Sequence, residues 1–308
     1  MNAITFNKTT GAAIVLLVTL YGSISTVSAT FSPTASVTLV SPKPKESFAT
    51  KRQVLDERHR QIEYEAMSAL AGTQNALMAL KKDDTSRAIA LLKEAAKQLN
   101  TLLNKYPHSN LIPALVDADI YEFDSDANQV ETLLKMANEL LADHRVQAAR
   151  QLLDQLVSEL HVTTISVPLG SFSMGVNDAA SFASSGNTGK AKDVLIEILN
   201  RLAKTVQITP IPILQAADLL KEASKLAQAG NRPNEDTKAQ ILALFDAIKE
   251  KLKFAEMLGY GAKGDYEQAN DAIDEIKSDV FTDKSADAWI KVSTTISSLN
   301  DKLTRLKK

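Results

Sequence analysis

The sequence predicts a mainly α-helical protein of antiparallel helical hairpins or a bundle, with a small two-stranded β ribbon. Three observations predict this fold. Apolar residues recur at the spacing of one helix face over most of the chain. Short polar turns separate these helical stretches. Only two segments, near 117–124 and 162–168, change to strand patterns.

Residues 1–29 have the pattern of a secretory signal peptide. Lys8 supplies the positive charge, an apolar run follows over 12–21, and small residues precede a cleavage site after Ala29. The run is shorter than the roughly 20 residues that a transmembrane helix needs. We therefore expect an exported protein, periplasmic or secreted, with no transmembrane segment in the mature chain; an uncleaved anchor is the alternative.

Composition limits the remaining possibilities. Residues 30–56 are rich in Ser, Thr, Pro and Lys, which predicts a disordered spacer. The chain has no cysteine, so its fold depends on an apolar core rather than on disulfides. The net charge is -2 and no Arg-rich stripe occurs, so we expect no nucleic-acid partner.

The first half of the predicted domain, 57–284, contains two pairs of helical stretches. One stretch runs from Ile62 to Leu80, and the next begins at a cap provided by Asp84 or Thr85. A second pair covers 125–141 and 146–160. The short polar turns within each pair indicate antiparallel neighbours.

Two segments favour strands. Around 117–124, acidic residues alternate with apolar ones in period two, which places the apolar side chains on one face of an extended strand. The β-branched run 162–168 fits a second strand, which could pair with the first. These two strands form the predicted ribbon.

The second half returns to helical patterns. We expect a Gly/Ser loop over 170–177, followed by a short helix and a long one whose apolar face includes residues from Ala191 to Leu202. The run Thr209–Pro212 ends that helix and begins another, since proline is tolerated in a first turn. The clearest internal joint is at 230–234.

The C-terminal segment, 285–308, has an apolar seam with the three- and four-residue steps of a coiled coil. One interpretation is a terminal helix packed in an antiparallel hairpin of the same chain. The other is self-association through the seam, which would make the protein a homo-oligomer. The seam consists of Trp289, Val292, Ile296, Leu299, Leu303 and Leu306.

The acidic strand is the one candidate metal site. Oxygen ligands of this kind suit a hard cation such as calcium. The segment lacks the glycine of an EF-hand loop, and strand alternation sends its carboxylates in differing directions. A solvated strand edge is the competing interpretation. The candidate ligands are Asp117, Asp119, Glu122 and Asp124.

No pattern indicates catalysis. The string Gly259–Gly264 matches G-x-G-x-x-G, but a helix precedes it, so we interpret it as a helix end and a hairpin turn. The four histidines show no metal-ligand spacing, and a pH-sensing role is the alternative to surface or capping positions for them. We expect no catalytic residue and no cofactor, and therefore a protein that is not an enzyme.

Several stretches resemble the YfdX family. Those with most weight are Gln147–Arg150 and Glu256–Tyr260, and their order and spacing with other short runs extend the resemblance over roughly 60–280. The other runs are 65–70, 76–80, 102–107, 111–113, 167–169 and 212–217.

The resemblance implies an exported, largely helical bacterial protein linked to stress tolerance of the acid or antibiotic type. It also implies a chaperone-like or small-molecule-binding role, and no catalytic residue to transfer. We therefore expect a non-enzymatic periplasmic protein that binds small molecules or unfolded peptides in a groove between helical hairpins. A scaffold protein that oligomerises through 285–308 is the alternative.

Overall fold

The computed structural model describes residues 48–59, 62–123, 127–228, 235–279 and 285–307. The signal-peptide prediction for 1–29, the first part of the predicted spacer and the joint at 230–234 lie outside the described residues.

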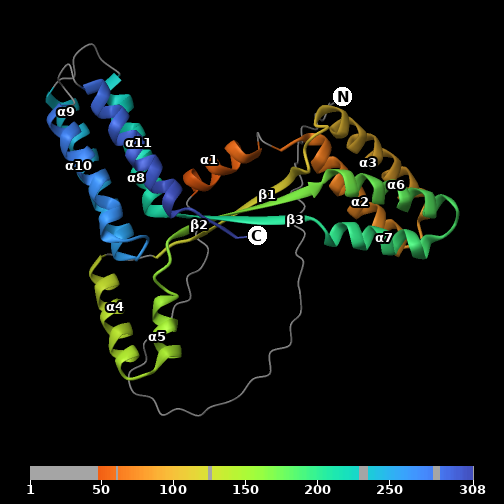
Figure 1. Cartoon of the computed structure of the whole chain (residues 1–308), viewed down its shortest axis with the longest axis horizontal. Helices are drawn as coiled ribbons and strands as arrows, with labels where there is room; N and C mark the ends of the chain where they lie inside the picture. The colour runs from red at the N-terminus through yellow and green to blue at the C-terminus, as the bar shows by residue number, and fades with distance from the viewer. Residues whose placement is uncertain (1–47, 60–61, 124–126, 229–234, 280–284, 308) are drawn as a thin grey trace, which may run out of the picture. The chain divides into compact units, whose positions relative to one another are not determined.

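The described residues form helices and one small sheet, which confirms the mainly α prediction (Figure 1). The helices are α1 (Phe48–His59), α2 (Tyr64–Lys81), α3 (Thr85–Lys105), α4 (Ala127–Ala142), α5 (Val146–Leu153), α6 (Leu169–Ser184), α7 (Thr188–Asn200), α8 (Ile211–Gln228), α9 (Glu235–Met257), α10 (Lys263–Asp279) and α11 (Ser285–Leu303). The strands are β1 (Leu111–Tyr121), β2 (Glu159–Pro168), β3 (Ala203–Pro210) and β4 (Arg305–Lys307).

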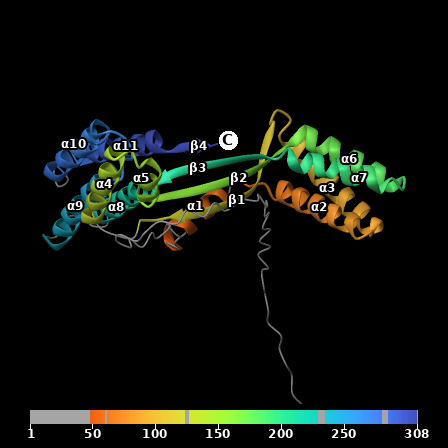
Figure 2. The ribbon, with the colours of Figure 1, turned by 90° about the horizontal axis from the view of Figure 1, so that it is seen from below.

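The sheet is antiparallel in the order β1-β2-β3-β4 (Figure 2). The predicted ribbon is the β1–β2 pair, in which Asp119 lies opposite His161. Burial alternates along β1 as predicted, with Val116, Ala118 and Ile120 buried and both intervening aspartates exposed. Pro113 lies at a register shift in this edge strand, where a missing N–H is tolerated.

The sheet is larger than the predicted ribbon. Residues 203–208 were expected near the end of a helix, but they form β3 against β2. Leu306 was expected in the helical seam, yet it lies in β4 and its side chain is 70% exposed. Both strands form because they pair with segments that are distant in sequence, and local periodicity cannot predict such pairing.

Four helices, α2, α3, α6 and α7, pack into one cluster (Figure 1). Alanines such as Ala66, Ala69 and Ala95 are almost fully buried there, so the helix backbones approach closely. The side chain of Asp84 accepts a hydrogen bond from the backbone N–H of Arg87 at 3.1 Å and caps α3, so the cap is the first of the two predicted residues.

The predicted Gly/Ser loop at 170–177 is wrong, because these residues belong to α6. Gly175 explains why glycine occurs inside this helix. It is buried, and a Cβ at this position would overlap the Cγ2 atom of Ile198 on α7. The glycine therefore permits close α6–α7 packing at some cost in helix propensity.

A second cluster contains α8, α9, α10 and α11. The seam residues Val292, Ile296 and Leu299 are buried inside this cluster. The C-terminal helix thus packs within the chain, as the first of the two interpretations expects. Homo-oligomerisation stays a prediction, but these side chains are already covered.

The helix α1 overlaps the predicted disordered spacer, 30–56, so the spacer does not reach Asp56 in the structure. Val54 and Leu55 pack against the apolar face of the sheet. Arg58 adds a hydrogen bond of 2.5 Å from Nη2 to Oε1 of Gln207 on β3. These tertiary contacts stabilise a helix in a largely polar segment, whose composition alone does not predict one.

The Gly175→Ala variant tests the α6–α7 contact. We expect it to lower the free energy of unfolding by about 1–3 kcal/mol, because Ile198 must move to admit the methyl group. Urea denaturation followed by circular dichroism measures this change.

The matched control is Gly170→Ala in the same helix, where an added Cβ meets nothing within 4 Å. We expect no loss of stability there, since alanine is the better helix former. Ile198→Ala should also cost less in the Gly175→Ala background than in the original chain. Equal losses at both glycines would contradict the packing argument.

Candidate functional site

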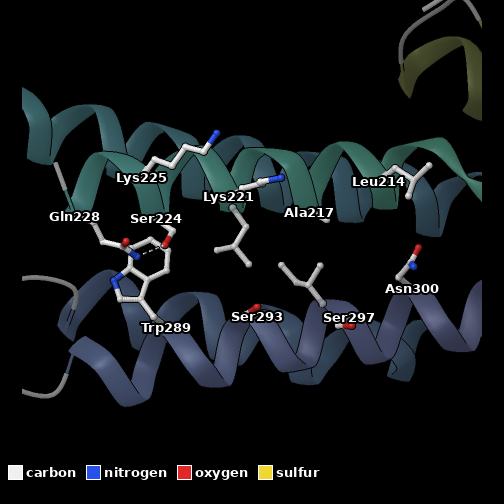
Figure 3. Close-up of a pocket in the computed structure, with 12 residues that line it drawn as sticks. Leu214, Ala217, Lys221, Ser224, Lys225, Gln228, Trp289, Ser293, Ser297 and Asn300 are labelled. Atoms are coloured by element: carbon white, nitrogen blue, oxygen red, sulfur yellow. Dashed lines mark hydrogen bonds between the residues drawn. The ribbon is translucent and has the colours of Figure 1, made fainter. Parts of the chain in front are cut away.

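A groove runs between α8 and α11 (Figure 3). Its volume is about 460 Å³. Side chains from the two helices face each other across it (Figure 3). The residues that line it are Leu214, Ala217, Leu220, Lys221, Ser224, Lys225, Gln228, Trp289, Ser293, Ile296, Ser297 and Asn300.

Small side chains make room for the groove. On α11, Ser293 and Ser297 lie one helical turn apart and beside the buried seam. On α8, Ala217 occupies a corresponding lining position. Large side chains at these positions would fill the space between the helices, whereas Leu220 and Ile296 close its floor.

Trp289 lines one end of the groove (Figure 3). It is the only tryptophan of the chain. Its ring packs against Phe245 on α9, with ring centroids 5.5 Å apart. This contact holds the indole in place while part of it remains accessible.

The polar side chains that line the groove are either positively charged or neutral. Lys221 and Lys225 are exposed on α8, and Gln228 donates from Nε2 to the Oγ of Ser224 at 3.0 Å. No acidic residue lines the groove among the described residues. In the same part of the chain, the Oδ1 of Asn300 is buried without a hydrogen-bond partner, which is unfavourable unless a bound group satisfies it.

Asp218 lies close to this rim on α8. Burial raises the pKa of its carboxyl, the charge of Lys221 lowers it, and the charge of Glu57 raises it again, with a net upward shift. The carboxylate of Asp218 therefore lies close enough to Lys221 for the two charges to interact.

A separate buried polar cluster surrounds Glu159 at the start of β2. Its carboxylate accepts a hydrogen bond from the Nε2 of His161 at 2.7 Å and pairs with the guanidinium of Arg305 on β4. Burial raises the pKa of Glu159, but the hydrogen bond from His161 and the charge of Arg305 outweigh it, so the pKa lies below its usual value. The carboxylate is therefore held in its charged form.

Two tyrosines complete this region. The backbone N–H of Ser158 donates to the hydroxyl oxygen of Tyr260 at 2.8 Å, and the hydroxyl of Tyr266 donates to the carbonyl of Tyr260. Burial raises the pKa of both hydroxyls, so both remain protonated donors. Gly259 and Gly261 have positive φ in the turn from α9 to α10, which confirms the helix-end interpretation of the glycine-rich string.

The structure does not gather the predicted metal ligands into a described site. Asp117 and Asp119 are exposed on β1, and Asp117 accepts a hydrogen bond from the N–H of Ala118 at 2.8 Å. Asp124 lies outside the described residues. Within the described ranges, no group of three or more His, Asp or Glu residues could hold a metal ion. Cation binding at this strand therefore stays a prediction.

The sequence predicted a groove between helical hairpins but did not locate it. It placed Trp289 and Ile296 in the apolar seam and predicted only that a helix begins at Thr209–Pro212. The available signal was Ser293, which follows the seam residue Val292 at a position where a coiled coil usually carries a charged side chain. None of the described helices is long and apolar enough to cross a membrane.

The fold defines a mainly helical protein with a small antiparallel sheet and a groove between two helices. The family described as YfdX protein matches residues 69–208. This match confirms the resemblance found in the sequence, although it is shorter than the range of roughly 60–280 expected there. The groove helices begin after the matched residues.

One similar solved structure is that of YfdX from Salmonella Typhi. It is 18% identical to this chain, with a TM-score of 0.34, and the match covers 47% of this chain and 90% of that one. No curated protein matches the chain.

The Glu159→Gln variant tests the buried cluster. The pKa of Glu159 is lowered in the folded state, so its charge stabilises the fold above the unfolded pKa of about 4.3, and this stabilisation disappears as the pH falls through the folded pKa. We expect the variant to lower the free energy of unfolding by about 1–3 kcal/mol at pH 7. Thermal unfolding from pH 7 to pH 3 should show the difference shrinking below about pH 4.5.

The control is Glu250→Gln, an exposed glutamate on α9. It should leave stability unchanged, within about 0.5 kcal/mol, at neutral pH. A Glu159→Gln effect that stayed constant down to pH 3 would show that the ionised carboxylate is not the stabilising group.

Proposed function

We propose that this protein is a non-enzymatic binding protein that holds a small molecule in the groove between α8 and α11. The main support is a concave site that has an apolar floor, one accessible tryptophan and a few convergent polar groups. Its volume of about 460 Å³ lies within the range of about 300–1,000 Å³ that small-molecule sites occupy. The buried, unpartnered Oδ1 of Asn300 adds support, because a ligand or water donor would satisfy it.

An unfolded peptide is the second ligand class within this proposal. Apolar side chains of a peptide would contact the same floor, and exposed main-chain groups would reach the serine and lysine rim. The volume favours a small molecule or a few side chains of a peptide over a long peptide segment. Both ligand classes require the same groove, so one set of variants tests both.

The proposal includes export and stress tolerance. Export rests on the signal pattern of residues 1–29, and the stress role rests on the resemblance to the YfdX family. A binding protein outside the cytoplasm would act by sequestering a harmful compound or an exposed apolar segment. No chemical step is required of the groove.

The double variant Ser293→Leu/Ser297→Leu tests the groove. Both serines are exposed and line it, so leucines would fill the space with little change to the buried core. We expect at least about a tenfold loss in affinity for the neutral probe N-phenyl-1-naphthylamine, because its contact area is occupied. Energy transfer from Trp289 to the probe measures binding beside the groove, since the chain has no other tryptophan.

The matched control is Ser298→Leu, which adds the same side chain at an exposed position of α11 that does not line the groove. It should keep the affinity of the original chain. The peptide class is examined with the same proteins, by measuring whether they slow the aggregation of a reduced, unfolded client. Unchanged probe binding in the filled variant, or equal loss in both variants, would remove the groove from the proposal.

A further inference from the structure

We propose that the ligand of the α8–α11 groove is an anionic single-chain amphiphile, with a carboxylate head at the lysine rim and an alkyl chain along the floor. This inference rests on the proposed function and specifies its ligand class. It follows from the charge of the rim, the donors opposite it and the shape of the apolar floor.

The rim is positive on the α8 side. Lys221 and Lys225 are four residues apart and therefore lie on one side of the helix. The salt bridges found among the described residues use other lysines, such as Lys249, Lys277 and Lys302. Neither Lys221 nor Lys225 forms one of these ion pairs, so both ammonium groups can contact a ligand, and the charge of Asp218 lies near that of Lys221.

The opposite rim supplies neutral donors. The hydroxyls of Ser293 and Ser297 come from α11 and face the groove (Figure 3). A carboxylate accepts hydrogen bonds from both ammonium and hydroxyl groups, whereas a cationic head would meet two like charges. The chain as a whole has 37 acidic and 35 basic residues, so the absence of acidic side chains from the described lining is a local property.

The floor suits an elongated apolar body. Leu214, Leu220 and Ile296 lie along it, and Trp289 stands at one end. From Leu214 to Gln228 the wall extends about 21 Å at the helical rise. An extended alkyl chain can follow such a path, whereas a compact polycyclic ligand would leave much of it empty.

Three probes with the same tail test the head group: dodecanoate, dodecanol and dodecyltrimethylammonium, each below its micelle-forming concentration. Binding to the full chain is measured by Trp289 fluorescence and by calorimetry at pH 7. We expect dodecanoate to bind about tenfold more tightly than dodecanol, since two charge-assisted contacts favour the carboxylate. The cationic probe should bind more weakly than dodecanol.

The variant Lys221→Gln/Lys225→Gln should remove most of the difference in affinity between dodecanoate and dodecanol. The matched control is Lys93→Gln/Lys97→Gln on α3, a pair of exposed lysines with the same spacing and no groove. This control has the same change in net charge, so it separates local contacts from the general field of the protein.

The outcomes separate the two proposals. Equal affinity for dodecanoate and dodecanol, or an equal loss in both lysine double variants, would overturn the anionic ligand class and leave groove binding intact. If no probe binds, including the neutral naphthylamine probe, the proposed function fails as well. A preference for the cationic probe would also overturn this inference.

Discussion

The antiparallel pairing of β3 is the constraint on which the geometry of the groove depends. The helix α8 begins at Ile211, directly after β3, and α11 leads into β4, which pairs with β3. Both walls are thus attached to one strand. A hydrogen bond of 3.2 Å between the hydroxyls of Thr209 and Thr304 strengthens this attachment, and Arg305 adds its ion pair with Glu159. The register of the β3–β4 pair therefore sets the distance between α8 and α11 near Asn300. Farther from the sheet, the side chains between the two helices determine that distance.

The sequence predicts much of this architecture because most helices carry their own periodic signal. The cap at Asp84 and the alternation along β1 were predicted locally and are found in the structure. Residues 203–210 and 305–307 were not predicted as strands, because their hydrogen-bond partners are distant in sequence. At Gly175 the error has another cause: glycine usually breaks a helix, but here contact with α7 favours it.

The candidate site was less predictable than the fold, because it is defined by what the side chains leave unfilled. The seam residues of 285–308 indicate that α11 packs against something, but not that small residues beside the seam face α8. The number of acidic residues in β1 suggested a metal site. Their positions in the strand place Asp117 and Asp119 on an exposed face instead. The seam pattern does not show that part of Trp289 stays accessible, and no pattern marks Asn300; both become informative only through their neighbours in the structure.

The family match and the groove occupy different parts of the chain, and this division bears on function. The match ends at Ile208 in β3, and the groove helices follow it. Within the matched part, the α2–α3–α6–α7 cluster is closely packed around alanines and Gly175. If binding resides in the α8–α11 groove, its specificity can change with substitutions at the rim while the family segment keeps its packing.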